Sequence, residues 1–293
     1  MFPIAYHTFE TLEEVLRFIG EEDDYRLLAG GTDLMVRYRA GKERAGKLVN
    51  LLIPELTGIR ETPTELVVGA STSLTSLADA FRPLGEPFSM LCTAAESVGS
   101  CQTRNLGTVG GNLCTGNASS DMATALLAAD ARLTICSRGG EQELPLEKFF
   151  VRNRVVNLNR GELLKEIRIP KPTSFRTAAD FKKLGKRKGH VIAALNLAVV
   201  LELDDGGLIR KARLAGGTLA PRPIRFYESE KLLVDCPAEG PELLRALEQI
   251  RACLLTEIEP RDSLRGSREY RMRTAPALLS DMILGACGRG GAE

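Results

Sequence analysis

Near the N-terminus, apolar residues follow the 3.6-residue period of an amphipathic helix. Leu12, Val15 and Ile19 fall on one side of such a helix, and Thr11 with Glu14 fits the capping box that starts one. This pattern predicts a helix that begins directly after Thr11. Further along, short apolar segments bounded by glycine and proline alternate with helical patterns, which predicts a chain of mixed helices and strands.

The order of these segments predicts three units. Apolar stretches at 25–29 and 48–53, together with the first helix, indicate a small α/β unit over 1–56. A second α/β unit is expected over 57–173, where two prolines mark its end. In the third unit, 174–293, extended segments precede amphipathic helices, an order typical of α+β folds. We therefore expect an α+β protein.

Within the second unit, five glycines between residues 99 and 116 predict a loop, and a helix is expected after it from about Asp121 to residue 129. In the third unit, Gly206 and Gly207 predict a hairpin turn between two strands. Strands are expected at 179–184, 191–203 and 209–214, and helices at 243–254 and 272–284.

Charge and composition narrow the possible functions. The chain has 39 Lys and Arg against 38 Asp and Glu, a net charge of +1, so bulk charge does not favour binding to nucleic acid. It has no Trp and only 5% aromatic residues, which disfavours a base-stacking surface. Its two histidines, His7 and His190, are too few for a multi-histidine metal centre. We therefore expect neither a nucleic-acid partner nor a bound metal.

The seven cysteines are scattered and form no C-x-x-C pair, which disfavours a zinc or iron–sulfur site held by this chain. No signal-peptide pattern opens the sequence, and the longest apolar run, at 191–203, is shorter than the ~20 residues of a membrane-spanning helix. We therefore expect free thiols and a cytoplasmic protein without membrane contact. Cys101 and Cys114 are expected to be packed thiols.

The first candidate binding segment is an apolar stretch that opens directly into Gly30, Gly31, Thr32 and Asp33. Consecutive glycines allow backbone N–H groups to point into one concave site for phosphate oxygens, and Thr32 can add a hydroxyl donor. The alternative is a tight turn at a strand end that needs a positive φ. Local sequence leaves both interpretations open.

A second glycine pair, Gly110 and Gly111, lies between Thr108 and Asn112, and Asp121 follows. Asp121 either caps the next helix or binds a ribose or ring hydroxyl with its carboxylate. The chain contains neither G-x-G-x-x-G nor G-x-x-x-x-G-K-[ST], so the usual dinucleotide and P-loop fingerprints are absent. Two glycine segments together favour a phosphate-containing cofactor more than either does alone.

Together these motifs resemble the FAD-binding subunit of the molybdenum hydroxylases, a family that includes xanthine dehydrogenase and carbon monoxide dehydrogenase. The segment 111–118 is most similar to the bacterial xanthine dehydrogenase type. The matching positions, which span almost the whole chain, are 29–33, Arg104, Asn105, 108–112, Asp121, 220–225 and 261–271.

The resemblance implies a two-subdomain FAD-binding fold of the vanillyl-alcohol oxidase type, followed by a C-terminal α+β flavoprotein domain. It implies that 28–34 wraps the FAD pyrophosphate and that 108–112 holds the phosphates and ribityl chain from the other side. Asp121 and Lys182 would lie against the cofactor. The residues expected to bind FAD are Leu28, Ala29, Gly30, Gly31, Thr32, Asp33, Leu34, Thr108, Gly110, Gly111, Asn112, Asp121, Leu164 and Lys182.

Some matches leave alternatives open. Leu163 and Leu164 match aliphatic residues that flank the isoalloxazine ring in the family, but both could equally be strand core. The segment 117–121 lacks the proline that many members carry there, which bears on the rigidity of this loop. The basic run at 182–188 is either a solvated strand edge or a surface that faces phosphates of NAD or a partner subunit.

The role implied by the family is electron transfer within a heteromeric enzyme. A substrate would be hydroxylated at a molybdopterin in one partner subunit, and electrons would pass through [2Fe-2S] clusters in another to FAD on this chain and then to NAD⁺. No side chain here would act as a catalytic acid or base, because the redox chemistry resides in the cofactor. The alternatives are a stand-alone flavin oxidoreductase of the same fold and a flavin-free assembly subunit.

Overall fold

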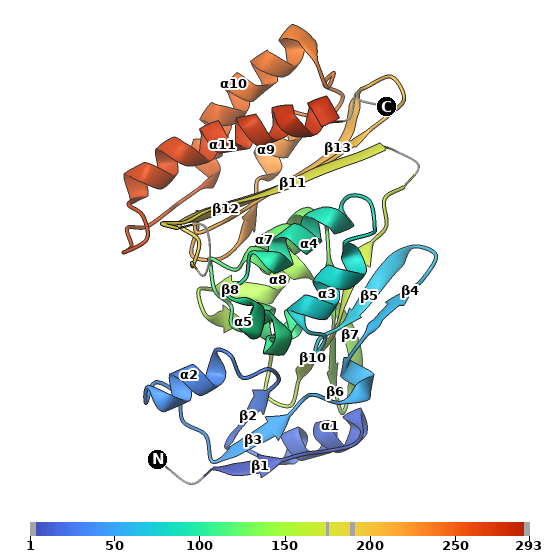
Figure 1. Cartoon of the computed structure of the whole chain (residues 1–293), viewed down its shortest axis with the longest axis vertical. Helices are drawn as coiled ribbons and strands as arrows, with labels where there is room; N and C mark the ends of the chain where they lie inside the picture. Colours follow the sequence, from blue (N-terminus) through green and yellow to red (C-terminus); the bar gives the residue numbers. More distant parts are fainter. Residues whose placement is uncertain (1–3, 174–175, 188–190, 290–293) are drawn as a thin grey trace.

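The computed structural model describes residues 4–173, 176–187 and 191–289. Three parts follow one another along the long axis of the molecule (Figure 1). A small sheet lies at the N-terminal end, a five-stranded sheet with its helices lies in the middle, and a four-stranded sheet covered by two long helices lies at the other end. The mixture of helices and sheets agrees with the expected α+β class.

The N-terminal part is a three-stranded parallel sheet in the order β1-β3-β2. The capping box at Thr11 is confirmed, because its hydroxyl accepts a bond from the Glu14 N–H while the Glu14 carboxylate accepts one from the Thr11 N–H. Val15 and Ile19 are fully buried in the core of this part. Its elements are β1 (Ala5–His7), α1 (Leu12–Glu21), β2 (Tyr25–Leu28), α2 (Leu34–Arg39) and β3 (Lys47–Asn50).

The middle part is a five-stranded antiparallel sheet in the order β4-β5-β10-β6-β7, with helices packed against it. Its strands are β4 (Ile59–Glu61), β5 (Glu65–Gly69), β6 (Arg132–Ser137), β7 (Gly140–Pro145) and β10 (Leu163–Pro170), beside a hairpin of β8 (Phe150–Arg152) and β9 (Val155–Val156). Its helices are the 3-10 turn Pro54–Leu56, α3 (Leu74–Phe81), α4 (Phe88–Glu96), α5 (Cys101–Leu106), α6 (Val109–Cys114), α7 (Asp121–Ala128) and α8 (Leu146–Phe149).

The segment 99–116 is not the loop that its glycines predict, because it contains the two short helices α5 and α6. Ser100 caps the first helix and Thr108 caps the second, each accepting a bond from the N–H group three residues further on. These side-chain caps stabilise helix starts that the high glycine content concealed. The second glycine pair therefore follows a helix and lies inside the next one.

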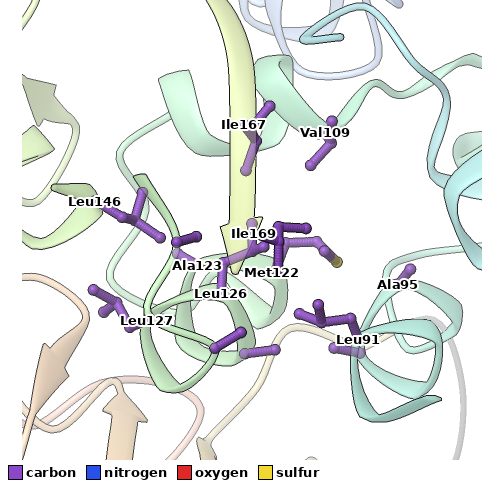
Figure 2. Close-up of a cluster of buried hydrophobic side chains, with 14 of the residues drawn as sticks. Leu91, Ala95, Val109, Met122, Ala123, Leu126, Leu127, Leu146, Ile167 and Ile169 are labelled. Carbon is purple, nitrogen blue, oxygen red and sulfur yellow. The ribbon is translucent and has the colours of Figure 1, made fainter. Parts of the chain in front are cut away.

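The core of the middle part packs α7 against the sheet and its neighbouring helices. Figure 2 shows Met122 and Leu126 of α7 in one cluster with Ile167 and Ile169 of β10, and all four side chains are fully buried. Every residue of α7 is buried, including Asp121 at its start. A charged residue in such a helix requires polar partners, because an unpaired buried charge is costly.

The C-terminal part is an antiparallel sheet in the order β11-β12-β13-β14. All nine residues of β12 are buried, because α10 and α11 pack on one face of the sheet and α4 and α7 on the other. This burial explains the continuous apolar run within 191–203. The elements are β11 (Arg176–Leu184), β12 (Leu195–Leu203), β13 (Ile209–Gly217), β14 (Ile224–Arg225), α9 (Tyr227–Lys231), α10 (Gly240–Glu257) and α11 (Arg268–Arg289).

Two further findings concern the described ranges only. No helix in them is both long and apolar enough to cross a membrane. No group of three or more His, Cys, Asp or Glu side chains in them is placed to hold a metal ion. His190 and Lys188, the end of the basic run, lie outside the described residues.

Candidate functional site

A cavity of about 660 Å³ lies where the three parts of the chain meet. This volume is typical of small-molecule and cofactor pockets, which span roughly 300–1,000 Å³. One wall comes from the segment between β2 and α2, and the opposite wall comes from α5, α6 and the residues that join them. The start of α7 and the end of β11 form the floor.

The first wall is the segment 28–34. Gly31 has a φ of +69°, in the left-handed region that glycine adopts most readily. Within the part of the chain that the structure describes, the N–H groups of Gly31, Thr32 and Asp33 bond to no protein oxygen, and α2 has no side-chain cap. A strand-end turn and a phosphate-binding segment are therefore compatible interpretations, because the turn leaves these three N–H donors free beside the cavity.

The two glycine segments meet at Gly30. A Cβ atom on Gly30 would lie 1.7 Å from the carbonyl oxygen of Leu106, the last residue of α5, so only glycine permits this approach. In the second pair, Gly111 lines the cavity. Gly110 instead faces Ala70 on the far side, and its N–H donates to the Ala70 carbonyl at 2.8 Å. In the second pair, Gly110 therefore packs against Ala70, whereas Gly111 forms part of the cavity surface.

The floor of the cavity is a buried polar cluster around Asp121, which is 5% exposed. Its carboxylate accepts one bond from Lys183 Nζ and another from Asn196 Nδ2, each at 2.6 Å. Burial raises the pKa of Asp121, although the Lys183 charge and these bonds partly offset that increase. Ser120, not Asp121, caps α7. The interpretation of Asp121 as the N-cap residue is therefore wrong, and its carboxylate is part of the cavity surface.

The edge of the cavity carries charges of both signs. Asp33 lies 3.7 Å from Arg154 Nη1 and 4.0 Å from Arg37 Nε, and Arg37 also bonds to Glu43 at 3.2 Å. Arg154 occupies the turn between β8 and β9, where its N–H donates to the Gly116 carbonyl at 2.7 Å. The Asp33–Arg154 pair connects the first wall with the middle part of the molecule.

Most residues expected to bind FAD line this cavity, whereas Gly110, Leu164 and Lys182 do not. Leu164 is 4% exposed within the middle core and Leu163 is fully buried, in agreement with the strand-core alternative for both. The Lys182 side chain is 54% exposed, on the opposite face of β11 from the cavity. The expected residues that line the cavity are Leu28, Ala29, Gly30, Gly31, Thr32, Asp33, Leu34, Thr108, Gly111, Asn112 and Asp121.

The sequence patterns do not identify several residues that line the cavity. Alternation along β11 could have identified Lys183, because it shares a strand face with the buried, apolar Phe181. Cys101 is exposed, so the expectation that it is a packed thiol is wrong. Cys114 lines the cavity, and burial raises the pKa of its thiol to about 12. No local pattern marks the charged residues at the edge, because turns and packing bring them there. The additional polar or charged lining residues include Arg37, Glu43, Arg154 and Lys183.

Comparison with known proteins agrees with the geometry of this site. Residues 2–172 match the family described as the FAD binding domain in molybdopterin dehydrogenase, and residues 180–286 match the CO dehydrogenase flavoprotein C-terminal domain. The chain is 32% identical over 298 residues to the putative xanthine dehydrogenase FAD-binding subunit of Escherichia coli strain K12. That alignment covers 100% of this chain and 99% of the relative.

Two solved structures also match the whole chain. Carbon monoxide dehydrogenase from Hydrogenophaga pseudoflava, in a form lacking the Mo-pyranopterin moiety, matches with a TM-score of 0.90 at 28% identity, covering 100% of both chains. Quinoline 2-oxidoreductase from Pseudomonas putida 86 matches with a TM-score of 0.86 at 26% identity, again covering 100% of both chains. These matches confirm the expected fold, an FAD-binding part followed by a C-terminal flavoprotein domain. The chain therefore belongs to the family of FAD-binding subunits of the molybdenum hydroxylases.

Proposed function

We propose that this protein binds FAD in the cavity and acts as the electron-transfer flavoprotein subunit of a heteromeric dehydrogenase of the xanthine dehydrogenase type. The observation that carries the proposal is the direct contact between the two glycine segments at Gly30 and Leu106. This contact makes two segments that are far apart in sequence into opposite walls of one cofactor-sized cavity.

The residues present fit the chemical groups of FAD. The free N–H groups of Gly31, Thr32 and Asp33 suit the oxygens of a pyrophosphate, for which glycine-rich backbone turns provide donors. The Asp121 carboxylate can accept a bond from a ribityl or ring hydroxyl, since each of its oxygens has a further lone pair. The cavity also has apolar surface for the ring system, from Leu28, Leu74 and Val98 among others.

The holding residues in this proposal are 28–34, Thr108, Gly111, Asn112 and Asp121. When bound, FAD supplies a centre that accepts single electrons and can release a hydride. The task of this chain is to bind, orient and shield that centre. None of these side chains is assigned a role as general acid or base.

The names of relatives support a heteromeric assembly. One relative is subunit alpha of the 6-hydroxypseudooxynicotine dehydrogenase complex of Paenarthrobacter nicotinovorans, 28% identical over 289 residues. By analogy we propose two cytoplasmic partners for this chain, one holding [2Fe-2S] clusters and one holding molybdopterin. Electrons would then leave this subunit for NAD⁺. The hydroxylated substrate would bind in the molybdopterin partner, so its identity is a property of that subunit.

The first test of this function is flavin content. Protein purified from its own host should show a flavin absorbance band, and the released cofactor should be FAD by mass spectrometry. Protein produced alone should take up added FAD, with quenching of flavin fluorescence on binding. If neither FAD nor FMN binds measurably, the proposed function is wrong.

The same purification tests the assembly. We expect a molybdopterin-containing subunit and a small iron–sulfur subunit to co-purify, with iron and molybdenum detected in the complex but not in the isolated chain. Turnover of an organic substrate by the isolated, FAD-loaded chain would instead identify a stand-alone oxidoreductase. Co-purification without any flavin would identify an assembly subunit.

A further inference from the structure

Two side chains of the C-terminal part hold the carbonyl oxygen of Ala194, the residue directly before β12. This oxygen accepts one bond from Arg271 Nε on α11 and another from Thr218 Oγ1 after β13, each at 2.7 Å. The N–H group of Ala194 donates to the Leu184 carbonyl at 2.8 Å. Both polar groups of the Ala194 backbone are therefore bonded, which fixes the end of the segment that leads into β12.

Arg271 is a buried cation whose guanidinium contacts three uncharged oxygens. It is 3% exposed. In addition to the bond to Ala194, Nη1 donates to the Arg261 carbonyl, and Nη2 donates to Ser263 Oγ at 2.8 Å. Burying a charge is costly unless hydrogen bonds replace its lost hydration, and here these bonds come from two separate segments. Arg271 therefore joins the segment before β12 to the turn before α11.

Thr218 has a backbone conformation that threonine rarely adopts. Its φ is +66°, in the left-handed region that favours glycine. Its N–H donates to the Ala118 carbonyl at 2.7 Å, in the loop between α6 and α7 that lines the cavity. Glycine would adopt this φ without strain but has no hydroxyl for Ala194. Because residues strained in this way concentrate at functional sites, the bond from the Thr218 hydroxyl points to a function for the segment it holds.

The segment that ends at Ala194 forms an apolar wall of the cavity. Val191 and Ile192 line the cavity, and Ile192 is 45% exposed. Val191 also packs against Gly185, where a Cβ atom would lie 2.5 Å from Val191 Cγ1. An exposed isoleucine in a cavity stabilises the bound state when an apolar ligand surface covers it. This wall therefore suits the ring system of FAD more than its phosphates.

We infer that Arg271 and Thr218 are positioning residues for this wall, acting through the Ala194 carbonyl. Two bonds to one oxygen restrict the backbone before β12 and so hold Val191 and Ile192 in place to cover the flavin ring system. The helix α11 thus contributes to cofactor binding, although none of its residues that the structure describes lines the cavity. The inference rests on the proposed function, since it takes FAD as the ligand of the cavity.

Two substitutions of Thr218 separate its hydroxyl from its shape. Thr218→Val removes the donor and keeps the branched side chain, whereas Thr218→Ser keeps the donor. We expect FAD affinity to fall about fivefold in Thr218→Val, equivalent to about 1 kcal/mol, and to change less than about twofold in Thr218→Ser. The measurement is fluorescence titration with FAD at neutral pH. Equal affinity of the wild type and Thr218→Val would overturn the inference.

Arg271→Lys tests the second bond to Ala194. Lysine keeps the charge, but its single ammonium group cannot replace the spread donors of a guanidinium. We expect FAD to bind about tenfold more weakly. The matched control is Arg273→Lys, an exposed position on the same helix, which should change affinity less than about twofold. Equal effects of the two substitutions would contradict positioning by Arg271. If Arg271→Lys does not fold, the two Thr218 variants decide the inference.

A double-mutant cycle shows whether Thr218 acts through the wall. In a background that carries Val191→Ala and Ile192→Ala, Thr218→Val should change FAD affinity less than about twofold, because the side chains that it positions are absent. A fivefold loss in both backgrounds would contradict action through the wall.

The visible circular dichroism of bound flavin provides a second readout, because it reports the surroundings of the ring system. At saturating FAD, this spectrum should change in Thr218→Val and stay that of the wild type in Thr218→Ser. An unchanged spectrum in Thr218→Val would contradict the inference while leaving the proposed function intact. Failure of the wild type to bind FAD would instead contradict the proposed function.

Discussion

At the scale of single residues, the glycines at this site have different structural roles, which depend on the atoms packed against each of them. Gly30 allows two segments to touch, Gly31 supplies a positive φ, and Gly110 packs on Ala70 away from the cavity. All three positions therefore require glycine, Gly30 and Gly110 for a close approach to backbone atoms and Gly31 for its conformation. A glycine pair in sequence therefore does not mean that both glycines face the cofactor.

Replacing Gly30 by alanine should disrupt both walls. Its Cβ would lie 1.7 Å from backbone oxygen, so the segments must separate. We expect a loss of about 1–3 kcal/mol in the free energy of unfolding, the usual cost of overpacking, together with weaker FAD binding. Urea unfolding and FAD titration measure the two effects.

Gly85→Ala is the control for this substitution, because no heavy atom lies within 4 Å of a Cβ at that position. It should change stability by less than about 0.5 kcal/mol, as is typical of surface substitutions. Normal FAD affinity in Gly30→Ala would show that contact between the walls is not needed for binding.

At the scale of elements, buried ion pairs join strands to helices at the boundary of the C-terminal sheet. Glu202 of β12 is 2% exposed and accepts bonds from Arg213 Nη2 at 2.6 Å and Lys211 Nζ at 3.2 Å. Arg213 also donates to the carbonyl oxygen of Ala128, at the end of α7. Burial alone would raise the pKa of Glu202, but the bonds to Arg213 and Lys211 outweigh this effect and hold the pKa below its ordinary value.

Because the pKa of Glu202 is lower in the folded protein, its pair contributes stability above the ordinary pKa and loses it as the pH falls through the folded value. Arg213→Met should therefore cost roughly 2–4 kcal/mol at pH 7, since it leaves a buried carboxylate with a weaker partner. The deficit should shrink as the pH falls, because Glu202 takes up a proton more readily in the variant than in the wild type.

Denaturant unfolding as a function of pH checks this expectation, with Arg210→Met as the control on the same strand. Arg210 forms its ion pairs at the surface, where its side chain is 38% exposed, so its loss should cost less than about 1 kcal/mol. A similar cost for both variants would show that burial of the Glu202 pair has no energetic consequence.

At the scale of the whole molecule, the C-terminal sheet belongs to two cores at once. Ala198 and Val200 of β12 pack into the core of the middle part, whereas Leu197, Val199 and Leu201 pack against the C-terminal helices. The boundary that the sequence predicts near 173 therefore divides the chain in sequence without separating two independent cores. We propose that the middle and C-terminal parts unfold together.

This proposal predicts one cooperative thermal transition for the wild-type chain. FAD at about 100 times its dissociation constant should stabilise the folded state by about 2.7 kcal/mol and shift the whole transition upward. Differential scanning calorimetry with and without FAD measures this. Two resolved transitions, of which FAD moves only one, would show that the parts unfold separately.

Much of the local structure follows from sequence patterns. Thr11 and Glu14 predict the first capping box, alternating and continuous apolar runs predict the strands of the C-terminal sheet, and the two glycine segments with Asp121 predict most of one cavity surface. These features depend on residues near one another in the chain, where spacing alone determines which groups meet. The sequence pattern does not predict the helices within 99–116, because the high glycine content indicates a loop and conceals the capping residues Ser100 and Thr108.

Long-range packing brings together the residues of the site. Alternation along β11 places Lys183 on the same strand face as Phe181, but only the folded chain shows that this face packs against the middle part and meets the cavity. Sequence spacing could not place Leu106 against Gly30 or Arg154 beside Asp33, since these contacts join segments far apart in the chain. Local sequence patterns are enough to specify the helices, the strands and the binding groups that these elements carry. Long-range packing determined the cavity, because only the folded chain brings its walls and floor within bonding distance.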